Sequence, residues 1–333
     1  MLPRVSVIVV HWNSARKPEL INRHICSLRR VEYENFEVIM VDNGSFDNTY
    51  ELLSGLTSND PRFRLCRSPS NLFYAGGNNF GYNYVSEDSE YVFLVNPDTI
   101  VARDCFSKMV ERLEQDSHVG IAQPYVGVYS PAYMTEDMVT IPVTNTEYLE
   151  REFYPTLTSG ALMVIRRNFL RKRGTIFHSV PLQYFDDDVL GIECWNQGWA
   201  VKYYPIIGGE HVGFAFSSSR IGVAHYNTAR LLKLIKSNSK YRYAIGLIAG
   251  SGLLKNTLTG LVKLDRDHVF TSAYTLAKQL AEKTNISLNI YAAPYIPISW
   301  SEFLKGQILL KSVVYNQKDL DPIYPKGIAS LIK

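Results

Sequence analysis

The sequence predicts an α/β protein with a mostly parallel central sheet flanked by helices, and three observations support this fold class. Residues 5–10 and residues 36–41 are short, continuous apolar runs rich in β-branched side chains, which is typical of strands covered on both faces. Between these runs, apolar residues recur at helical spacing from Leu20 to Leu28. Strand, helix and strand in this order predict the right-handed crossover connections of a parallel sheet.

The same alternation continues along the chain. His24 lies in the first helical pattern, where we expect a surface position rather than a ligand's role. Residues 126–155 show no clear period, so an insertion or a flexible loop over the site is expected there. Further strands are predicted over residues 62–67, 91–96 and 119–123, and further helices over residues 106–113 and 272–283.

Composition and charge argue against several classes of protein. The 333 residues include 35 Lys and Arg against 32 Asp and Glu, a net charge of +3 that does not indicate a partner nucleic acid. The four cysteines are scattered singly, so neither disulfides nor a zinc site is predicted, and a reducing, cytoplasmic setting fits best. No secretory signal is visible after Met1, so the chain is expected to stay inside the cell.

Polar residues follow three of the predicted strands, at the edge of the sheet where α/β proteins collect their ligands. The third group, Asn96-Pro97-Asp98, suits a divalent cation or a ribose. The alternative for this tripeptide alone is a turn in which Asp98 caps the next helix. The other two groups are His11-Trp12-Asn13 and Asp42-Asn43-Gly44-Ser45.

A glycine-rich stretch lies between the second and third of these groups. Gly76 and Gly77, followed by Asn78 and Gly81, would let the backbone approach a ligand and open the helix that follows. The free N–H groups of such a helix start suit a phosphate. The stretch is neither a dinucleotide-binding motif nor a P-loop, and a simple loop is the alternative.

Together these motifs resemble, in order and spacing, the family-2 inverting glycosyltransferases with the GT-A fold, and especially their rhamnosyltransferase-like branch. The resemblance covers residues 1–225 and implies a nucleotide-sugar-binding and catalytic domain there. Residues 226–333 would form an α-rich, basic C-terminal region. The resemblance also implies a nucleotide-sugar donor and a divalent metal.

On the donor side, the resemblance implies that Asp42 accepts a hydrogen bond from the imide of uracil or thymine, so that the donor is a UDP- or dTDP-sugar. A carboxylate matches the N–H of these bases and would repel the acceptor atom of cytosine. The loop from His11 to Asn13 would pack beside the base. Gly76, Gly77 and Asn78 would face the diphosphate.

For the metal, the resemblance implies that Asp98 is the second acid of the family's Asp-x-Asp motif. Asn96 replaces the first acid, which removes one charge from the site. His211 lies 24 residues after the acid that we expect to act as base, the separation typical of the family's metal-site histidine. A carboxylate paired with an imidazole suits Mn²⁺ or Mg²⁺, and Mn²⁺ accepts nitrogen more readily.

Three successive acids, Asp186, Asp187 and Asp188, precede a helical pattern and are candidates for the general base. Adjacent like charges raise one another's pKa, which suits proton abstraction. A helix start, where acids favour the dipole, explains them equally well on physical grounds. The resemblance favours catalysis, because these acids align with the family's Glu-Asp-x-Asp pattern and Asp187 then takes the place of the base.

The resemblance also implies an acceptor side. Gly160, in the segment 158–167, would admit the acceptor sugar close to the backbone, with Asp186, Asp188 and Trp195 nearby. The structural alternative for this segment is a core strand with a basic end. The Gln-x-x-Arg-Trp motif of processive polysaccharide synthases is absent from the sequence, so one sugar per encounter is expected.

The C-terminal region contains a long basic stretch. No acidic residue lies between Glu210 and Asp265, whereas eight cations do. A basic amphipathic surface of this kind suits an anionic membrane, and a polyprenyl-linked glycan acceptor would follow; a helical unit with solvated lysines is the alternative. The end of the chain would extend this surface or form a homodimer contact. The eight cations are Arg220, Arg230, Lys233, Lys236, Lys240, Arg242, Lys255 and Lys263.

The sequence therefore predicts an inverting, non-processive glycosyltransferase of the cell envelope, placed in the cytoplasm and peripheral on the inner face of the membrane. The alternative is a catalytically inactive nucleotide-sugar-binding or scaffold protein, which the missing acid at Asn96 permits.

Overall fold

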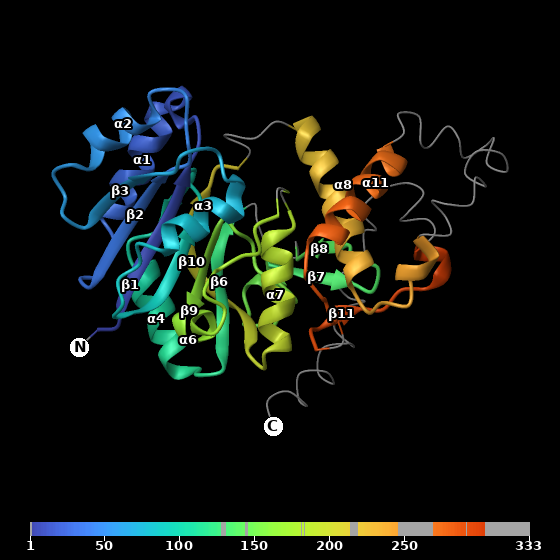
Figure 1. Cartoon of the computed structure of the whole chain (residues 1–333). Helices are drawn as coiled ribbons and strands as arrows, with labels where there is room; N and C mark the ends of the chain where they lie inside the picture. The colour runs from blue at the N-terminus through green and yellow to red at the C-terminus, as the bar shows by residue number, and fades with distance from the viewer. Residues whose placement is uncertain are drawn as a thin grey trace.

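The fold is built around one large mixed sheet, and Figure 1 shows it in a computed structural model. The structure describes residues 2–127, 131–143, 146–180, 182, 184–213, 219–245, 269–290 and 292–303. Within these residues, eight strands form the sheet in the order β3-β2-β1-β4-β9-β6-β10-β5. Their bounds are β1 Arg4–His11, β2 Phe36–Asp42, β3 Phe63–Arg67, β4 Ser89–Val95, β5 Thr99–Val101, β6 Val119–Gly127, β9 Leu162–Arg166 and β10 Ala200–His211.

Strand direction brings the ends of distant strands to one edge of this sheet. Strands β3, β2, β1 and β4 are parallel, and β9 runs antiparallel to both β4 and β6. Strand β10 is parallel to β6, and β5 is antiparallel to β10. The carboxyl ends of β1, β2, β3, β4, β6 and β10 therefore share an edge with the start of β9.

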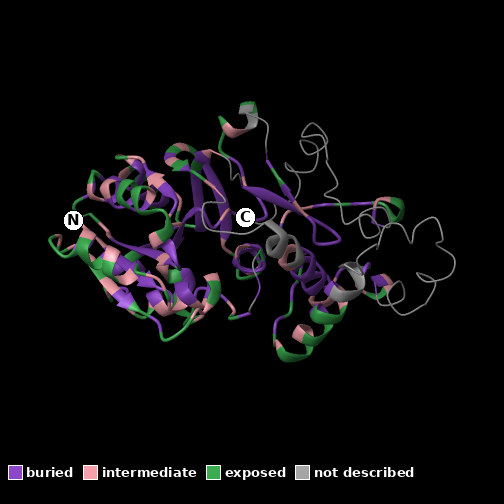
Figure 2. Cartoon of the chain, turned by 90° about the horizontal axis from the view of Figure 1, so that it is seen from above, coloured by how far each residue is buried: buried purple, intermediate pink, exposed green. Residues whose placement is uncertain are grey.

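Helices cover both faces of the sheet. Side chains alternate between the faces of a strand, so Ile8 and Val10 face helix α3 while His11 faces helix α1 on the opposite side. Figure 2 shows the central strands as almost wholly buried, whereas the helices that flank them alternate between buried and exposed residues. The helices in the first part of the chain are η1 Ser14–Arg16, α1 Pro18–Arg29, α2 Thr49–Thr57, α3 Phe73–Tyr82, α4 Cys105–Gln115, α5 Thr146–Leu149, α6 Arg167–Arg171 and α7 Asp186–Asn196.

A second hydrophobic cluster joins the middle of the chain to its C-terminal part. It contains Met134 and Met138 from residues 131–143, Ile192 from α7, and Leu231 and Leu234 from α8. Beside it lies a small sheet in the order β11-β7-β8. The remaining elements are β7 Ala132–Thr135, β8 Thr140–Pro142, β11 Tyr295–Ile296, α8 Ser219–Lys236 and α11 Val269–Lys283, and Figure 1 shows α8 and α11 packed together.

The structure changes one expectation for this part of the chain and leaves another as a prediction. The region 126–155, expected as an insertion or flexible loop, contributes β7 and β8 to the small sheet and buried side chains to the second cluster. The boundary expected at residue 225 falls inside α8, so the division into residues 1–225 and 226–333 stays a prediction. No helix of the part that the structure describes is long and apolar enough to cross a bilayer.

The structure also changes the expectation of a basic, membrane-facing surface. Arg230 and Lys233 are buried and pair with Asp137 and Asp188, so these cations do not form a basic surface for a membrane. The side chains of Arg220, Lys255 and Lys263 lie outside the described residues. The other three cations contact protein oxygens: Lys236 the carbonyl of Ala281, Lys240 the carboxylate of Glu136, and Arg242 the carbonyl of Ser237.

His24 is fully buried rather than on the helix surface, because α1 turns this side toward the sheet. Its Nδ1 lies 2.6 Å from the carbonyl oxygen of Thr99, at the start of β5. Burial lowers the pKa of His24 to about 4, so the ring is neutral at physiological pH. The residue ties α1 to the strand that follows Asp98.

Candidate functional site

A carboxylate and an imidazole meet where β4 and β10 end. Asp98 Oδ1 lies 2.9 Å from His211 Nε2, and both side chains are buried. The antiparallel pairing of β5 with β10 places Thr99 opposite His211, and the N–H of Val212 donates to the carbonyl of Asp98. Asn96 lies beside them, with its Nδ2 3.3 Å from His211 Nε2.

This pair fits a divalent cation that a diphosphate helps to bind. One carboxylate and one imidazole are ligands that Mn²⁺ accepts, and they lie at the strand ends where α/β folds bind phosphates. Among the described residues, no group of three or more His, Cys, Asp or Glu is placed to hold a metal ion. A cation at Asp98 and His211 would therefore take its remaining ligands from the diphosphate and from water.

Asp187 lies in the first turn of α7 and is hydrogen-bonded to the backbone just before β9. The N–H of Gly160 donates to Asp187 Oδ2 at 3.1 Å, and the hydroxyl of Tyr74 donates to the carbonyl of Gly160 at 3.0 Å. A Cβ at Gly160 would lie 2.7 Å from the Tyr74 hydroxyl oxygen, so this contact requires glycine. Asp187 is half-buried as a residue, whereas Asp186 and Asp188 on either side are buried.

The electrostatics of this helix start suit a proton acceptor. Burial, and then the negative charge of Asp188, raise the pKa of Asp187 to about 6. Burial and the charge of Asp187 also raise the pKa of Asp186 well above its usual value. The sequence-based prediction of raised pKa values is confirmed in direction, but burial contributes more than the neighbouring charges.

Two residues just before β9, Gly160 and Ala161, link Asp187 to Asp98 and His211, the predicted base to the predicted metal ligands. Gly160 holds Asp187, and the next residue, Ala161, accepts hydrogen bonds from the N–H of Asn96 at 2.9 Å and from Thr99 Oγ1 at 3.1 Å. Asn96 and Thr99 flank Asp98. The predicted base and the predicted metal ligands therefore lie on one edge of the sheet, joined through two adjacent residues.

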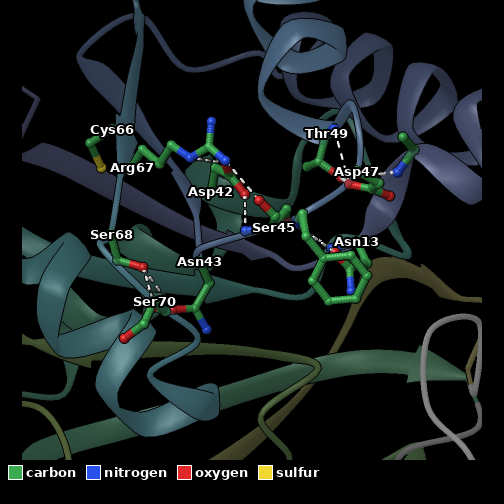
Figure 3. A network of polar contacts seen from close by, with 12 residues as sticks. Asn13, Asp42, Asn43, Ser45, Asp47, Thr49, Cys66, Arg67, Ser68 and Ser70 are labelled. Carbon is green, nitrogen blue, oxygen red and sulfur yellow. Dashed lines mark hydrogen bonds and ion pairs between the residues drawn. The ribbon is translucent and has the colours of Figure 1, made fainter.

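A polar network surrounds Asp42 at the end of β2 (Figure 3). Asp42 is fully buried, and it accepts a hydrogen bond from the N–H of Ser45 at 3.1 Å. Arg67 Nε lies 3.1 Å from Asp42 Oδ2, while 44% of the Arg67 side chain is exposed. Arg67 therefore stands between the carboxylate and the solvent.

Asn43, the next residue, organises the turn before α3. Its Oδ1 accepts from the N–H of Leu72 at 3.0 Å and from Ser68 Oγ at 3.2 Å. Its Nδ2 donates to Asn71 Oδ1 and to the carbonyl of Phe73 (Figure 3 shows this side chain beside Ser68 and Ser70). One buried amide thus fixes the loop between β3 and α3.

Comparison with known proteins identifies the family. Residues 6–174, just over half of the chain, match the model of glycosyl transferase family 2. The chain belongs to glycosyl transferase family 2. An uncharacterized glycosyltransferase from Haemophilus influenzae is 26% identical over 209 residues, which cover 60% of this chain and 63% of that protein.

A second relative, poly-beta-1,6-N-acetyl-D-glucosamine synthase from Staphylococcus aureus, is 26% identical over 201 residues, covering 56% of this chain and 45% of that protein. The chain thus spans less than two thirds of the length of these curated relatives of family 2.

Solved structures confirm the α/β fold of the GT-A type for this family-2 chain. The mannosyltransferase PcManGT from Pyrobaculum calidifontis, in complex with GDP-Man and Mn²⁺, superposes with a TM-score of 0.54 and 17% identity over 100% of this chain and 84% of that one. GalNAc-T7 with UDP, GalNAc and Mn²⁺ superposes with a TM-score of 0.58 and 15% identity, over 80% of this chain and 55% of that one. At these identities the likeness shows the fold alone.

Several side chains that were expected to face ligands in this family-2 site face the interior instead. Asp186 is buried, and Asp188 pairs with Lys233 and accepts a hydrogen bond from Thr140 Oγ1 at 2.9 Å. Trp195 is also buried, and its Nε1 donates to the carbonyl of Pro155 at 3.2 Å. The contacts of Asp188 and Trp195 tie α7 to α8, to β8 and to the segment that contains Pro155.

The loop after β1 differs from expectation in the same way. The ring of His11 is fully buried against His24, with ring centroids 6.2 Å apart, so it cannot pack beside a base. Asn13 adopts a left-handed backbone with a φ of 48°, and its Oδ1 accepts from the N–H of Phe46. Sequence reasoning missed the ring of Phe46, which is 82% exposed and contacts Trp12 edge-on; an apolar residue in a polar turn was the available signal.

The glycine-rich stretch forms the helix α3 itself rather than a loop ahead of a helix. A Cβ at Gly77 would lie 2.7 Å from Val10 Cγ1, so this glycine lets the helix pack closely on the sheet. Gly76 lies beside the side chain of Leu72, and Asn78 Nδ2 donates to the carbonyl of Tyr74 within the helix. The predicted role of Gly76, Gly77 and Asn78 in phosphate binding is replaced by helix packing.

Proposed function

We propose that this chain transfers one sugar from a UDP- or dTDP-sugar to a hydroxyl of a glycan acceptor, with inversion at the anomeric carbon. The observation that carries the proposal is the position of Asp187. Asp187, a half-buried residue with a raised pKa, accepts a hydrogen bond from Gly160, next to the strand ends that present Asp98 and His211. This is the arrangement that a base opposite a metal-bound leaving group requires.

In the proposed reaction, Asp187 takes the proton of the acceptor hydroxyl as its oxygen bonds to the anomeric carbon. The bond from that carbon to the diphosphate oxygen breaks, and the nucleoside diphosphate leaves with the electron pair. Asp98 and His211 would hold Mn²⁺ or Mg²⁺. The cation would neutralise charge that develops on the diphosphate.

On the donor side, Asp42 is the proposed reader of the nucleobase. Its carboxylate is a hydrogen-bond acceptor, which matches the imide N–H of uracil or thymine. Because Arg67 covers Asp42, binding of the base through this carboxylate requires the half-exposed Arg67 side chain to move aside. The absence of the Gln-x-x-Arg-Trp motif of processive polysaccharide synthases from the sequence supports one transfer per encounter.

The proposal is tested by replacing the base. A thermal-shift screen of nucleotide sugars first identifies a donor that stabilises the protein in the presence of Mn²⁺. With that donor, Asp187→Asn should lower turnover by roughly a hundred- to ten-thousandfold while donor binding is kept, because the substitution removes a general base. Asp88→Asn is the matched control, since Asp88 is an exposed acid at the start of β4, on the opposite edge of the sheet.

The two outcomes separate an enzyme from a binding protein. Loss of turnover in Asp187→Asn alone supports the proposed reaction. Donor binding without measurable turnover in the unsubstituted protein, over glycan acceptors and metals, would instead identify an inactive nucleotide-sugar-binding protein.

A further inference from the structure

The three successive acids at the start of α7 differ in burial. Asp186 and Asp188 are buried on either side of Asp187, yet Asp187 has to be the anion if it is to accept a proton. The structure holds a cation next to one of these acids: Lys233 Nζ contacts Asp188 Oδ2, and the Lys233 side chain is 1% exposed. A buried lysine beside a proposed active site calls for a physical reason, because burying an ammonium group is costly unless it is paired.

The contact comes from a distant part of the chain. Lys233 belongs to α8, which packs with α11 and shares the second hydrophobic cluster with α7. Thr140 Oγ1, from β8, donates to the same Asp188 oxygen at 2.9 Å. Two elements outside the main sheet thus fix Asp188 and leave the carboxylate of Asp187 on the side of Gly160.

We propose that Lys233 is a positioning residue for the base: it neutralises and fixes Asp188, so that Asp187 on the same helix turn remains an anion near neutral pH. The inference rests on the proposed function for its catalytic meaning, but not for its electrostatics. The positive charge of Lys233 also favours the ionised form of Asp187 directly.

Among the residues that the structure describes, the other ionisable groups around Asp187 carry no positive charge. Tyr74 from α3 is neutral, since burial and the charge of Asp187 raise its pKa well above the usual value. Tyr184, which precedes the helix, is likewise neutral at physiological pH. Within the described residues, the cation that acts on Asp187 from a packed neighbouring element is therefore Lys233, and the other four groups are anionic or neutral. The groups are Asp186 and Asp188 on α7, Tyr184 before it, Tyr74 on α3 and Lys233 on α8.

The test measures the ionisation of Asp187 in the full-length, metal-free protein. The carboxyl ¹³C resonance of Asp187, assigned by its loss in Asp187→Asn, is followed from pH 4 to pH 9 in labelled protein. Lys233→Met should raise the titration midpoint by about one pH unit or more, because Asp188 then carries an uncompensated like charge. Lys233→Arg, which keeps the cation, should retain the midpoint of the unsubstituted protein.

Two further variants keep the test decisive if Lys233→Met does not fold. Asp188→Asn removes the like charge but keeps the cation, so it should lower the midpoint. The double variant Lys233→Met with Asp188→Asn should return the midpoint toward that of the unsubstituted protein. An Asp187 midpoint that does not move in Asp188→Asn, or in folded Lys233→Met, would overturn the proposal.

The chain also offers a matched control. Arg230, one turn earlier on α8, forms a buried ion pair with Asp137 at 3.1 Å. Arg230→Met breaks a pair of the same kind in the same helix and should lower the melting temperature without moving the Asp187 midpoint. An equal shift in Arg230→Met would show that general loosening of α8, rather than the charge of Lys233, controls Asp187. Because the titration needs no substrate, its outcome is independent of whether Asp187→Asn abolishes sugar transfer.

Discussion

Asp187 has the properties that a proton acceptor needs at the scale of a single residue. Asp187 is a half-buried residue, one of its carboxylate oxygens accepts a hydrogen bond from the Gly160 N–H, and its pKa is raised to about 6. Asp186 and Asp188, one residue away on each side, are buried and lack the first of these properties. Position in the helix turn therefore gives the proposed base a different burial from that of its two neighbouring acids.

The raised pKa of Asp187 predicts the pH dependence of sugar transfer. A base works in its ionised form, so turnover should fall as the pH decreases through about 6, where Asp187 takes up a proton. A pH profile of kcat with the donor found by screening would measure this midpoint. An acidic limb centred near pH 4 would contradict control of turnover by an acid with the raised pKa of Asp187.

Substitution of Asp42 tests how the base of the donor is read. Asp42→Asn should weaken binding of the uridine nucleotide by roughly ten- to a hundredfold, because a hydrogen bond to a charged group is lost. It should weaken binding of a cytidine nucleotide less, since the carboxylate no longer repels that base. Calorimetry with UDP and CDP measures both effects, and the melting temperature serves as the check that Arg67, freed from its partner, has not disturbed the fold. Equal losses for UDP and CDP would show that Asp42 supports the loop and does not contact the base.

At the scale of elements, the close packing of α3 on the sheet depends on its glycines. Gly77 and Gly81 would each place a Cβ 2.7 Å from a branched side chain of β1, that of Val10 or Ile8. The backbone of both strand residues is held by pairing, that of Ile8 with β2 and β4 and that of Val10 with β2. The helix therefore reaches its position over β1 and β2 only with glycine at these places.

A glycine-to-alanine comparison tests this packing. Gly77→Ala should lower the free energy of unfolding by roughly 1–3 kcal/mol, the usual cost of an extra carbon in a full core. Gly55→Ala, in α2 with no atom within 4 Å of its added Cβ, should be neutral or stabilising because alanine favours a helix. Urea unfolding of both variants gives the two values. Equal stability of the two variants would show that α3 can move away from the sheet.

The sequence predicted the long strands well and the short or unusual elements poorly. Continuous apolar runs such as residues 36–41 can hardly be anything but covered strands. The glycine-rich α3 was missed because glycine disfavours helices locally, and here the packing on β1 overrides that preference. Strands β7 and β8 were missed because they have four and three residues, and because β7 pairs with β11, far along the chain, as well as with β8.

At the site, sequence reasoning predicted that Asp98, Asp187 and His211 meet, and the structure has these three side chains at one edge of the sheet. It could not separate exposed from buried members of a motif. Asp186, Asp188, Trp195 and His11 were assigned to ligands, yet each is buried by contacts with residues far away in the sequence. Burial of this kind depends on the packing of α7 and α1, which a single sequence does not encode locally.

At the scale of the whole molecule, the proposed metal ligands Asp98 and His211 meet only through β10, the strand of the large sheet that comes last in the chain. Asp98 follows β4, whereas His211 ends β10, and the pairing of β5 with β10 brings them to 2.9 Å. His211→Ala and Asp98→Ala should each lower metal-dependent turnover by roughly a hundredfold or more, since each removes a direct ligand. Titration of turnover with Mn²⁺ in chelator-treated protein measures the loss. Activity that persists in both variants and in chelator would remove the cation from the proposal.

The pairing of β5 with β10 has a consequence for a chain that is still being synthesised. The loop with Asp42, the helix α3 and the Asn96–Asp98 turn are all complete before the ribosome has added the residues of β10. A nascent chain of that length contains Asp98 but lacks His211, the other proposed ligand of the cation. The proposed cation site therefore forms only after translation has passed His211 and β10 has paired with β5.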